Sequence, residues 1–236
     1  MSETRSTDSQ AQIGKAEPGT RKVGKLLILF ALAVLVLLLL GGSGVVWRVA
    51  RRPKPPVQVT SLVMDFQEGS PAVGWQYLWN VGPIGVTNSY RSLVWNGSSY
   101  GPDNSSQFPR PYPGRYVKIS RRGGHPGAGI KQGSSNEVYA IAAFTFTNSG
   151  WFVITNSHLG RTEADREGEV VLRVFVNEHF IGPELVCNTK AGQSFDRELG
   201  LLKGGDTLYV AVGPNDHDRY DHFDWDFSIF RSDRKK

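Results

Sequence analysis

Hydrophobic and polar positions follow two different patterns in this chain. From Leu26 to Trp47 the residues are almost all apolar, and none of these 22 residues is charged. As a helix this segment would be about 33 Å long, enough to cross a hydrocarbon core of roughly 30 Å. Trp47 and the arginines that follow it suit the membrane interface. The pattern therefore predicts one N-terminal transmembrane helix.

From Val57 onward, short apolar stretches alternate with turn residues. In the last of them Phe223, Trp225 and Phe227 alternate with aspartates, and this period of two places one set inward and the other outward. No amphipathic helix is evident after residue 47. We therefore expect an all-β fold, an antiparallel β-sandwich of the jelly-roll type over 57–231. The expected strands lie at 57–66, 74–80, 91–96, 139–146, 151–158, 169–177, 194–202, 207–213 and 223–230.

The segments around the span complete the domain prediction. Residues 1–25 form a polar leader that we expect to be disordered, 48–56 a basic, proline-containing linker, and 232–236 a basic tail. Basic residues flank the span on both sides, so the charge rule is nearly balanced. We expect the N-terminus in the cytoplasm and the C-terminal domain in the periplasm or outside the cell. A cleaved signal peptide is the alternative, because the apolar run is followed by Gly-Gly-Ser-Gly.

The net charge of +5 comes from the two flanks of the span. The chain has 27 Lys and Arg and 22 Asp and Glu, of which 1–25 and 48–54 hold nine and three. The remainder has 18 basic and 19 acidic residues, so the predicted domain lacks the basic excess of a nucleic-acid-binding fold. One cysteine, Cys187, allows no intramolecular disulfide, so stability must come from a packed core.

Several short motifs carry a family resemblance. Gly-Gly-His-Pro-Gly precedes the apolar run at 139–146, and Gly-Asp, Pro-Asn and an aspartate precede the last two strands. With these motifs, residues 60–230 resemble a family of jelly-roll modules, similar to galactose-binding-like and carbohydrate-binding domains, in exported bacterial proteins, notably of planctomycetes. The resemblance implies that fold and a carbohydrate-binding role, although we expect this short chain to depart from the family in being anchored and in lacking an attached enzyme domain. The matching residues are Trp75, Tyr77, His125, Pro126, Gly127, Gly205, Asp206, Pro214, Asn215 and Asp221.

The acidic stretch Asp216–Phe227 contains the residue types of a metal or catalytic site. Asp216, Asp218 and Asp221 suit a calcium ion, although the EF-hand pattern is absent. His217 and His222 suit zinc, and a hydrolase using the His and Asp residues of 216–226 is a further alternative. We favour a structural loop, in which Asp221 accepts backbone N–H bonds and fixes the entry into the last strand. No cofactor is then required.

Aromatic residues give the second candidate binding site. Trp75, Tyr77 and Trp79 share one face of a strand, so they form either a platform for stacking on sugars or part of the core. The segment Tyr100–Tyr116, which includes Tyr112, is either a rigid binding loop or a cover over the sandwich. His125 suits a loop-holding role.

The sequence contains no nucleophile elbow or phosphate-binding loop, so we expect a non-enzyme. The favoured function is a single-pass, membrane-anchored binding or scaffold domain, with an envelope glycan as the candidate ligand. An accessory subunit of a larger membrane protein complex is the alternative. Nucleic acid is not an expected partner.

Overall fold

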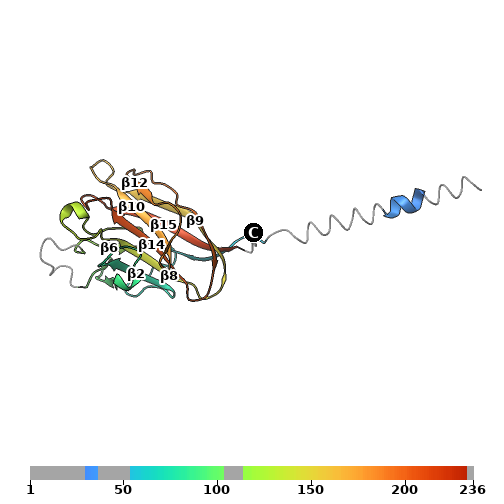
Figure 1. Cartoon of the computed structure of the whole chain (residues 1–236), viewed down its shortest axis with the longest axis horizontal. Helices are drawn as coiled ribbons and strands as arrows, with labels where there is room; N and C mark the ends of the chain where they lie inside the picture. The colour runs from blue at the N-terminus through green and yellow to red at the C-terminus, as the bar shows by residue number, and fades with distance from the viewer. Residues whose placement is uncertain (1–29, 37–53, 104–113, 233–236) are drawn as a thin grey trace, which may run out of the picture. The chain divides into compact units, whose positions relative to one another are not determined.

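The structure is a computed structural model that describes residues 30–36, 54–103 and 114–232. The chain divides into two compact units, Met1–Arg52 and Pro53–Lys236. In the first unit, residues 30–36 form a helix, drawn in blue in Figure 1. None of the described helices has the length and apolar character of a membrane span. The expected span lies largely outside the described residues, as do the leader and most of the linker and tail.

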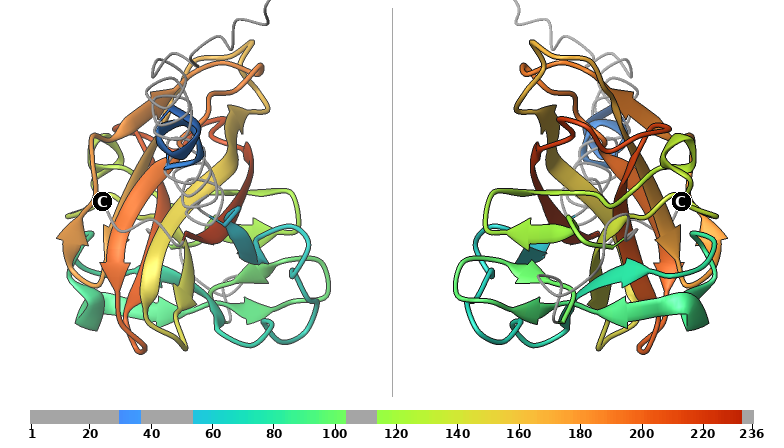
Figure 2. Two further views of the ribbon diagram at one scale, coloured as in Figure 1. Left: turned by 90° about the vertical axis from the view of Figure 1, so that its right-hand side faces the viewer. Right: turned by 90° about the vertical axis from the view of Figure 1, so that its left-hand side faces the viewer.

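The second unit is an antiparallel β-sandwich, so the all-β expectation is confirmed (Figure 1). Its larger sheet, here called sheet A, has eight strands, and the first and last strands of the unit pair within it. Both views in Figure 2 show the strands of the sandwich. The order in sheet A is β13 (Arg197–Leu202), β9 (Gly150–Arg161), β15 (Phe223–Ser232), β7 (Gly123–His125), β6 (Lys118–Ser120), β5 (Tyr100–Gly101) and β4 (Val94–Trp95), with β1 (Val57–Ser61) also paired to β15.

Among the described residues, sheet B has seven strands. The strand predicted at 91–96 is divided between the two sheets. The order in sheet B is β11 (His179–Phe180), β10 (Val170–Val176), β14 (Thr207–Pro214), β8 (Ala140–Thr145), β2 (Trp75–Asn80) and β3 (Tyr90–Ser92), with β12 (Leu185–Cys187) paired to β10. The 3-10 turn η1 (Thr87–Ser89) connects β2 and β3, and η3 (Ile130–Gln132) lies between β7 of sheet A and β8 of sheet B.

The core lies between the sheets and follows the period of two. Phe223, Trp225, Phe227 and Ile229 of β15 are each at most 2% exposed, which confirms the predicted inward ladder. The pairing of β15 with β9 shifts between Asp226 and Ser228, so a bulge interrupts the ladder without turning it outward. The inward register is therefore maintained along the whole strand.

Sheet B also buries the central part of its outer face. Leu78, Ile141 and Ala211 are opposite one another on β2, β8 and β14, and all three are buried. Ile84 and Tyr90 pack against this second hydrophobic cluster. Burial on both faces explains why β8 reads as a continuous apolar run rather than as an alternation.

Candidate functional site

The acidic stretch does not form a cluster. Asp216 accepts a hydrogen bond from Lys131 Nζ at 2.6 Å, Asp218 accepts one from the Gln132 amide, and Asp221 is fully buried. No three His, Cys, Asp or Glu side chains of the described residues come together as metal ligands. The three aspartates therefore do not provide the converging oxygen ligands that a calcium site requires. We find no geometric support for the calcium hypothesis.

The two histidines of the stretch also lie apart. His217 lines a pocket together with Lys131 and Arg161, whereas His222 lines a different pocket, beside His125. Asp224 pairs with His158, whose Nε2 lies 2.9 Å from its Oδ2. The side chains of this stretch thus lie at separate sites. The zinc and hydrolase alternatives each require these side chains to converge on one site, and the described geometry does not show such a site.

Asp221 interacts with an arginine side chain instead of the backbone N–H groups expected from the sequence. Neither of its carboxylate oxygens has a hydrogen-bond donor among the described residues, so the expected bonds from backbone N–H groups are wrong. The Arg161 guanidinium lies beside it, with Nε 3.7 Å from Oδ1. Arg161 also donates to the carbonyl oxygens of Tyr220, Arg166 and Glu167 at 3.2, 2.9 and 2.6 Å. An arginine cation, rather than a metal, thus ties this loop together.

This buried pair has an unusual electrostatic balance. Burial raises the pKa of the Asp221 carboxyl to about 8, and Arg161 opposes that rise. The exposed fractions of the Arg161 and Asp221 side chains are 1% and 0%. Desolvation dominates because the carboxyl receives no hydrogen bond that would favour its charged form.

Of the two alternatives for the aromatic residues of β2, a platform for sugars or part of the core, the structure supports the core. Trp75, Tyr77 and Trp79 are 4%, 2% and 7% exposed and belong to the core, because their face of β2 is turned towards sheet A. Tyr100 is also buried, with its ring centroid 4.6 Å from that of Tyr77. These rings cannot stack on a ligand. Tyr112 lies outside the described residues.

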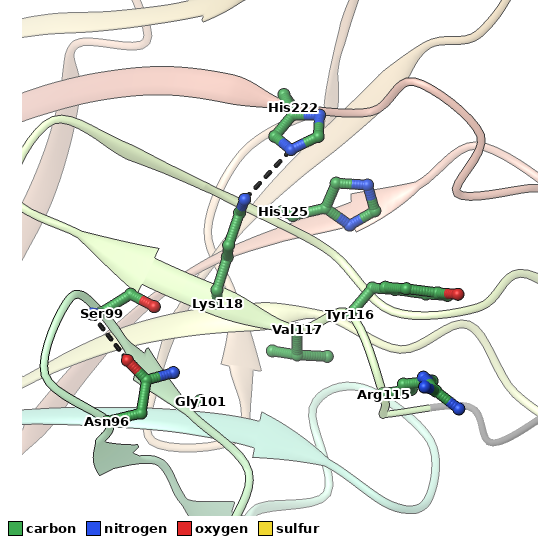
Figure 3. Close-up of a pocket in the computed structure, with 9 residues that line it drawn as sticks. All are labelled: Asn96, Ser99, Gly101, Arg115, Tyr116, Val117, Lys118, His125 and His222. Carbon is green, nitrogen blue, oxygen red and sulfur yellow. Dashed lines mark hydrogen bonds between the residues drawn. The ribbon is translucent and has the colours of Figure 1, made fainter. Parts of the chain in front are cut away.

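A pocket of about 210 Å³ lies on the outer face of sheet A (Figure 3). Lys118 of β6 is directly opposite His125 of β7. By the same register, Gly101 of β5 continues the row on one side and His222, just before β15, on the other. The intervening residues point into the core, so this row faces outward. The lining residues are Asn96, Ser99, Gly101, Arg115, Tyr116, Val117, Lys118, His125 and His222.

Two glycines of β7 allow the neighbouring backbone to approach closely beside this row. A Cβ atom at Gly123 would lie 2.0 Å from the Phe223 carbonyl oxygen, and one at Gly124 would lie 2.3 Å from the Lys118 carbonyl oxygen. Only glycine fits these contacts. The rings of His125 and His222 can then meet edge to face, with centroids 4.6 Å apart. The Gly-Gly-His motif thus has a structural explanation.

Hydrogen bonds define the protonation of both histidines. His125 Nδ1 lies 2.5 Å from the Pro126 carbonyl oxygen, which only accepts, so Nδ1 carries the proton and Nε2 is an acceptor. His222 Nε2 lies 3.0 Å from Lys118 Nζ, which only donates, so the His222 proton is on Nδ1, 3.4 Å from Glu163 Oε1. Burial lowers the pKa of His125 to about 4 and also lowers that of His222. Both rings are therefore neutral at pH 7, and His125 holds its loop as expected.

The rim of the pocket combines an aromatic ring with polar groups. Tyr116 is 45% exposed, and the Arg115 guanidinium lies 5.9 Å from the centroid of its ring. Asn96 Oδ1 accepts the backbone N–H groups of Ser98 and Ser99, which fixes the turn between β4 and β5. None of the described lining residues is acidic. The pocket can donate and accept hydrogen bonds, but its lining offers no carboxylate pair for acid–base chemistry.

Most of these residues escaped the sequence analysis. Lys118, Arg115 and Asn96 come from strands and turns too short to give a periodic signal, and their grouping depends on cross-strand register. Two signals were present: the His-Pro-Gly motif at His125 and the aromatic segment that ends at Tyr116. His222 was considered only as a zinc ligand or as part of the hydrolase alternative.

No family model and no curated relative matches the chain. Among solved structures, it is similar to the structure of the CBM51-2 and INT domains from Clostridium perfringens ZmpB, with 15% sequence identity and a TM-score of 0.33. That match covers 76% of this chain and 30% of the other. A likeness of this size carries no information about ligand or activity.

Proposed function

We propose that this chain is a non-catalytic saccharide-binding protein and that the pocket beside Lys118 and His125 is its binding site. The observation that supports this most is the combination of an exposed ring, Tyr116, with neutral and charged hydrogen-bonding groups on one sheet face. Saccharides present apolar C–H faces and many hydroxyl groups, so they are bound by such a combination. His125 Nε2 supplies an acceptor and Lys118 a donor for hydroxyl groups.

The proposal includes attachment to a membrane. The apolar segment Leu26–Trp47 has the length and composition of a span, and it lies largely outside the described residues. With the N-terminus in the cytoplasm, the domain would face the periplasm or the exterior, where envelope glycans occur. Resistance of the full chain to alkaline carbonate extraction would support this attachment. A mature N-terminus near Gly44 would contradict it.

The binding site is tested with the full chain, purified in detergent, on an array of neutral and acidic glycans. We expect Tyr116→Ala to weaken binding at least about tenfold, because the exposed ring is the stacking surface. Tyr220→Ala is the matched control, since Tyr220 is also exposed and lies beside Arg166 instead. The proposal fails if no glycan binds. In that case a membrane protein that co-purifies with the chain would favour the accessory-subunit alternative.

A further inference from the structure

We infer that the saccharide bound at this pocket carries an acidic group, a carboxylate or a sulfate ester, which Lys118 and Arg115 contact. This inference rests on the proposed function and names the ligand class of the same site. It follows from the charges of the lining residues, from the donors that they present and from their contrast with the rest of the domain.

The lining of the pocket is positive although the domain around it is not. Lys118 and Arg115 are cations, both histidines are neutral at pH 7, and the lining residues that the structure describes include no acidic one. Two carboxylates outside the described lining act on its histidines: Glu163 Oε1 lies 3.4 Å from His222 Nδ1, whereas Lys118 contacts Nε2 of that ring, and Asp218 acts electrostatically on His125. Outside 1–25 and 48–54 the chain has 18 basic and 19 acidic residues, so a set of described lining residues with two basic members and no acidic member is a local feature. Such a site favours an anion.

The donors of the pocket suit an oxyanion. Lys118 uses one N–H on His222 Nε2, which directs the ammonium group across the row, and two N–H groups remain. Figure 3 shows the Lys118 side chain extending towards His222 from the middle of the pocket. The Arg115 guanidinium, beside the Tyr116 ring, offers a planar set of donors that matches a carboxylate or sulfate. An acidic sugar would thus contact the ring with its apolar face and the cations with its charged group.

A neutral saccharide would interact less strongly with Lys118 and Arg115 than an acidic one. Its hydroxyl groups can accept from Lys118, but an oxyanion adds the attraction between opposite charges to the same hydrogen bonds. Binding should therefore depend on the ligand charge and on salt, because about 1 M salt reduces the screening length to roughly 3 Å.

The test compares two matched ligand pairs by calorimetry with the full chain in detergent. One pair is trigalacturonate and its methyl ester, and the other is a sulfated galactan oligosaccharide and the same oligosaccharide after desulfation. We expect at least one acidic member to bind about tenfold or more tightly than its neutral partner at low salt, and this preference to disappear near 1 M salt. The pair that discriminates identifies the group as a carboxylate or a sulfate ester.

Substitutions assign the preference to the pocket. Lys118→Met should remove most of the difference between the two members of a pair, and Lys118→Arg should keep it. Lys131→Met is the matched control, because Lys131 is an exposed lysine that pairs with Asp216 in another pocket. It should change nothing. Unfolding curves of each variant report whether the fold is retained.

The outcomes separate this inference from the proposed function. Equal binding of acidic and neutral members overturns the acidic ligand and leaves saccharide binding in place. A preference that survives Lys118→Met in a folded protein overturns the assignment of the acidic group to Lys118 in this pocket. Binding by neither pair, together with an array on which only neutral glycans bind, also overturns the acidic ligand alone. An array without any binding overturns both.

Discussion

The outer faces of the two sheets differ in polarity and in whether they are covered. In sheet B the cross-strand row Leu78, Ile141 and Ala211 is apolar and is sealed by Ile84 and Tyr90. In sheet A the corresponding row is polar, with Lys118 opposite His125, and a glycine in the row leaves room for the pocket. The same antiparallel pairing thus produces a second core on one side and a ligand surface on the other. The volume and polarity of the side chains along one row decide whether a face becomes a core or a pocket.

The largest expected effect is on stability, at the sealed face. Ile141→Ala should lower the free energy of unfolding by about 2–5 kcal/mol, because Ile141 is fully buried and its neighbours on β2 and β14 cannot fill the space. Chemical denaturation of the full chain measures the loss, and Ile141→Val, at about 0.5–1.5 kcal/mol, is the graded control. A loss below 0.5 kcal/mol for both would mean that this face is not a core.

The next expected effect concerns the buried pair at the end of sheet A. An unfolded aspartate has a pKa near 3.9, whereas that of Asp221 in the fold is about 8. Between these values the unfolded state releases a proton that the folded state keeps, so the contribution of Asp221 to stability falls as pH rises from about 4 to 8. The wild type should lose roughly 1–3 kcal/mol relative to Asp221→Asn between pH 5 and pH 8, with Arg161 limiting the size.

Denaturation curves of both proteins at four pH values test this sign. Other titrating groups cancel in the difference between the two curves. A wild type that gains stability relative to the variant towards pH 8 would show instead that the ion pair with Arg161 outweighs burial.

A smaller effect should separate the pocket from the fold. At Gly101 a Cβ atom would lie 3.5 Å from the Val117 carbonyl oxygen and 3.6 Å from Asn96 Nδ2, which are ordinary contacts. Gly101→Ala should therefore keep the fold and most of the glycan affinity. Gly101→Leu should occupy the pocket and reduce affinity about tenfold or more while the protein still unfolds cooperatively. Unchanged affinity in the folded leucine variant would place the ligand elsewhere.

The smallest expected effect is that of a chelator. The described aspartates of 216–221 have separate protein partners, so removal of divalent cations should leave the melting temperature of the full chain unchanged within about 1 °C. Differential scanning calorimetry with and without the chelator measures this. A transition that falls with chelator and returns with calcium would make these residues ligands and would end the account of Arg161 as the cation of the loop.

The core was predictable and the pocket was not, for a physical reason. The alternation in β15 specifies its inward side chains locally, and a long strand carries enough residues to show a period of two. Strands β4 to β7 have two or three residues each, and the residues of the pocket meet only through pairing between them. The burial of Asp221 was missed because its partner, Arg161, is 60 residues away in sequence. The jelly-roll assignment and the membrane span remain predictions.

The pairing of β1 with β15 has a mechanical consequence. Val57 is opposite Arg231, so the chain enters and leaves the domain at one end of β15, while His222 lies at the other end. The ten residues of β15 separate these ends by roughly 30 Å. Tension between a ligand held at the pocket and the point of chain entry would run lengthwise along β15. The hydrogen bonds of β1 to β15 would then share the load in shear rather than break one after another, so the domain would transmit such a pull with little extension.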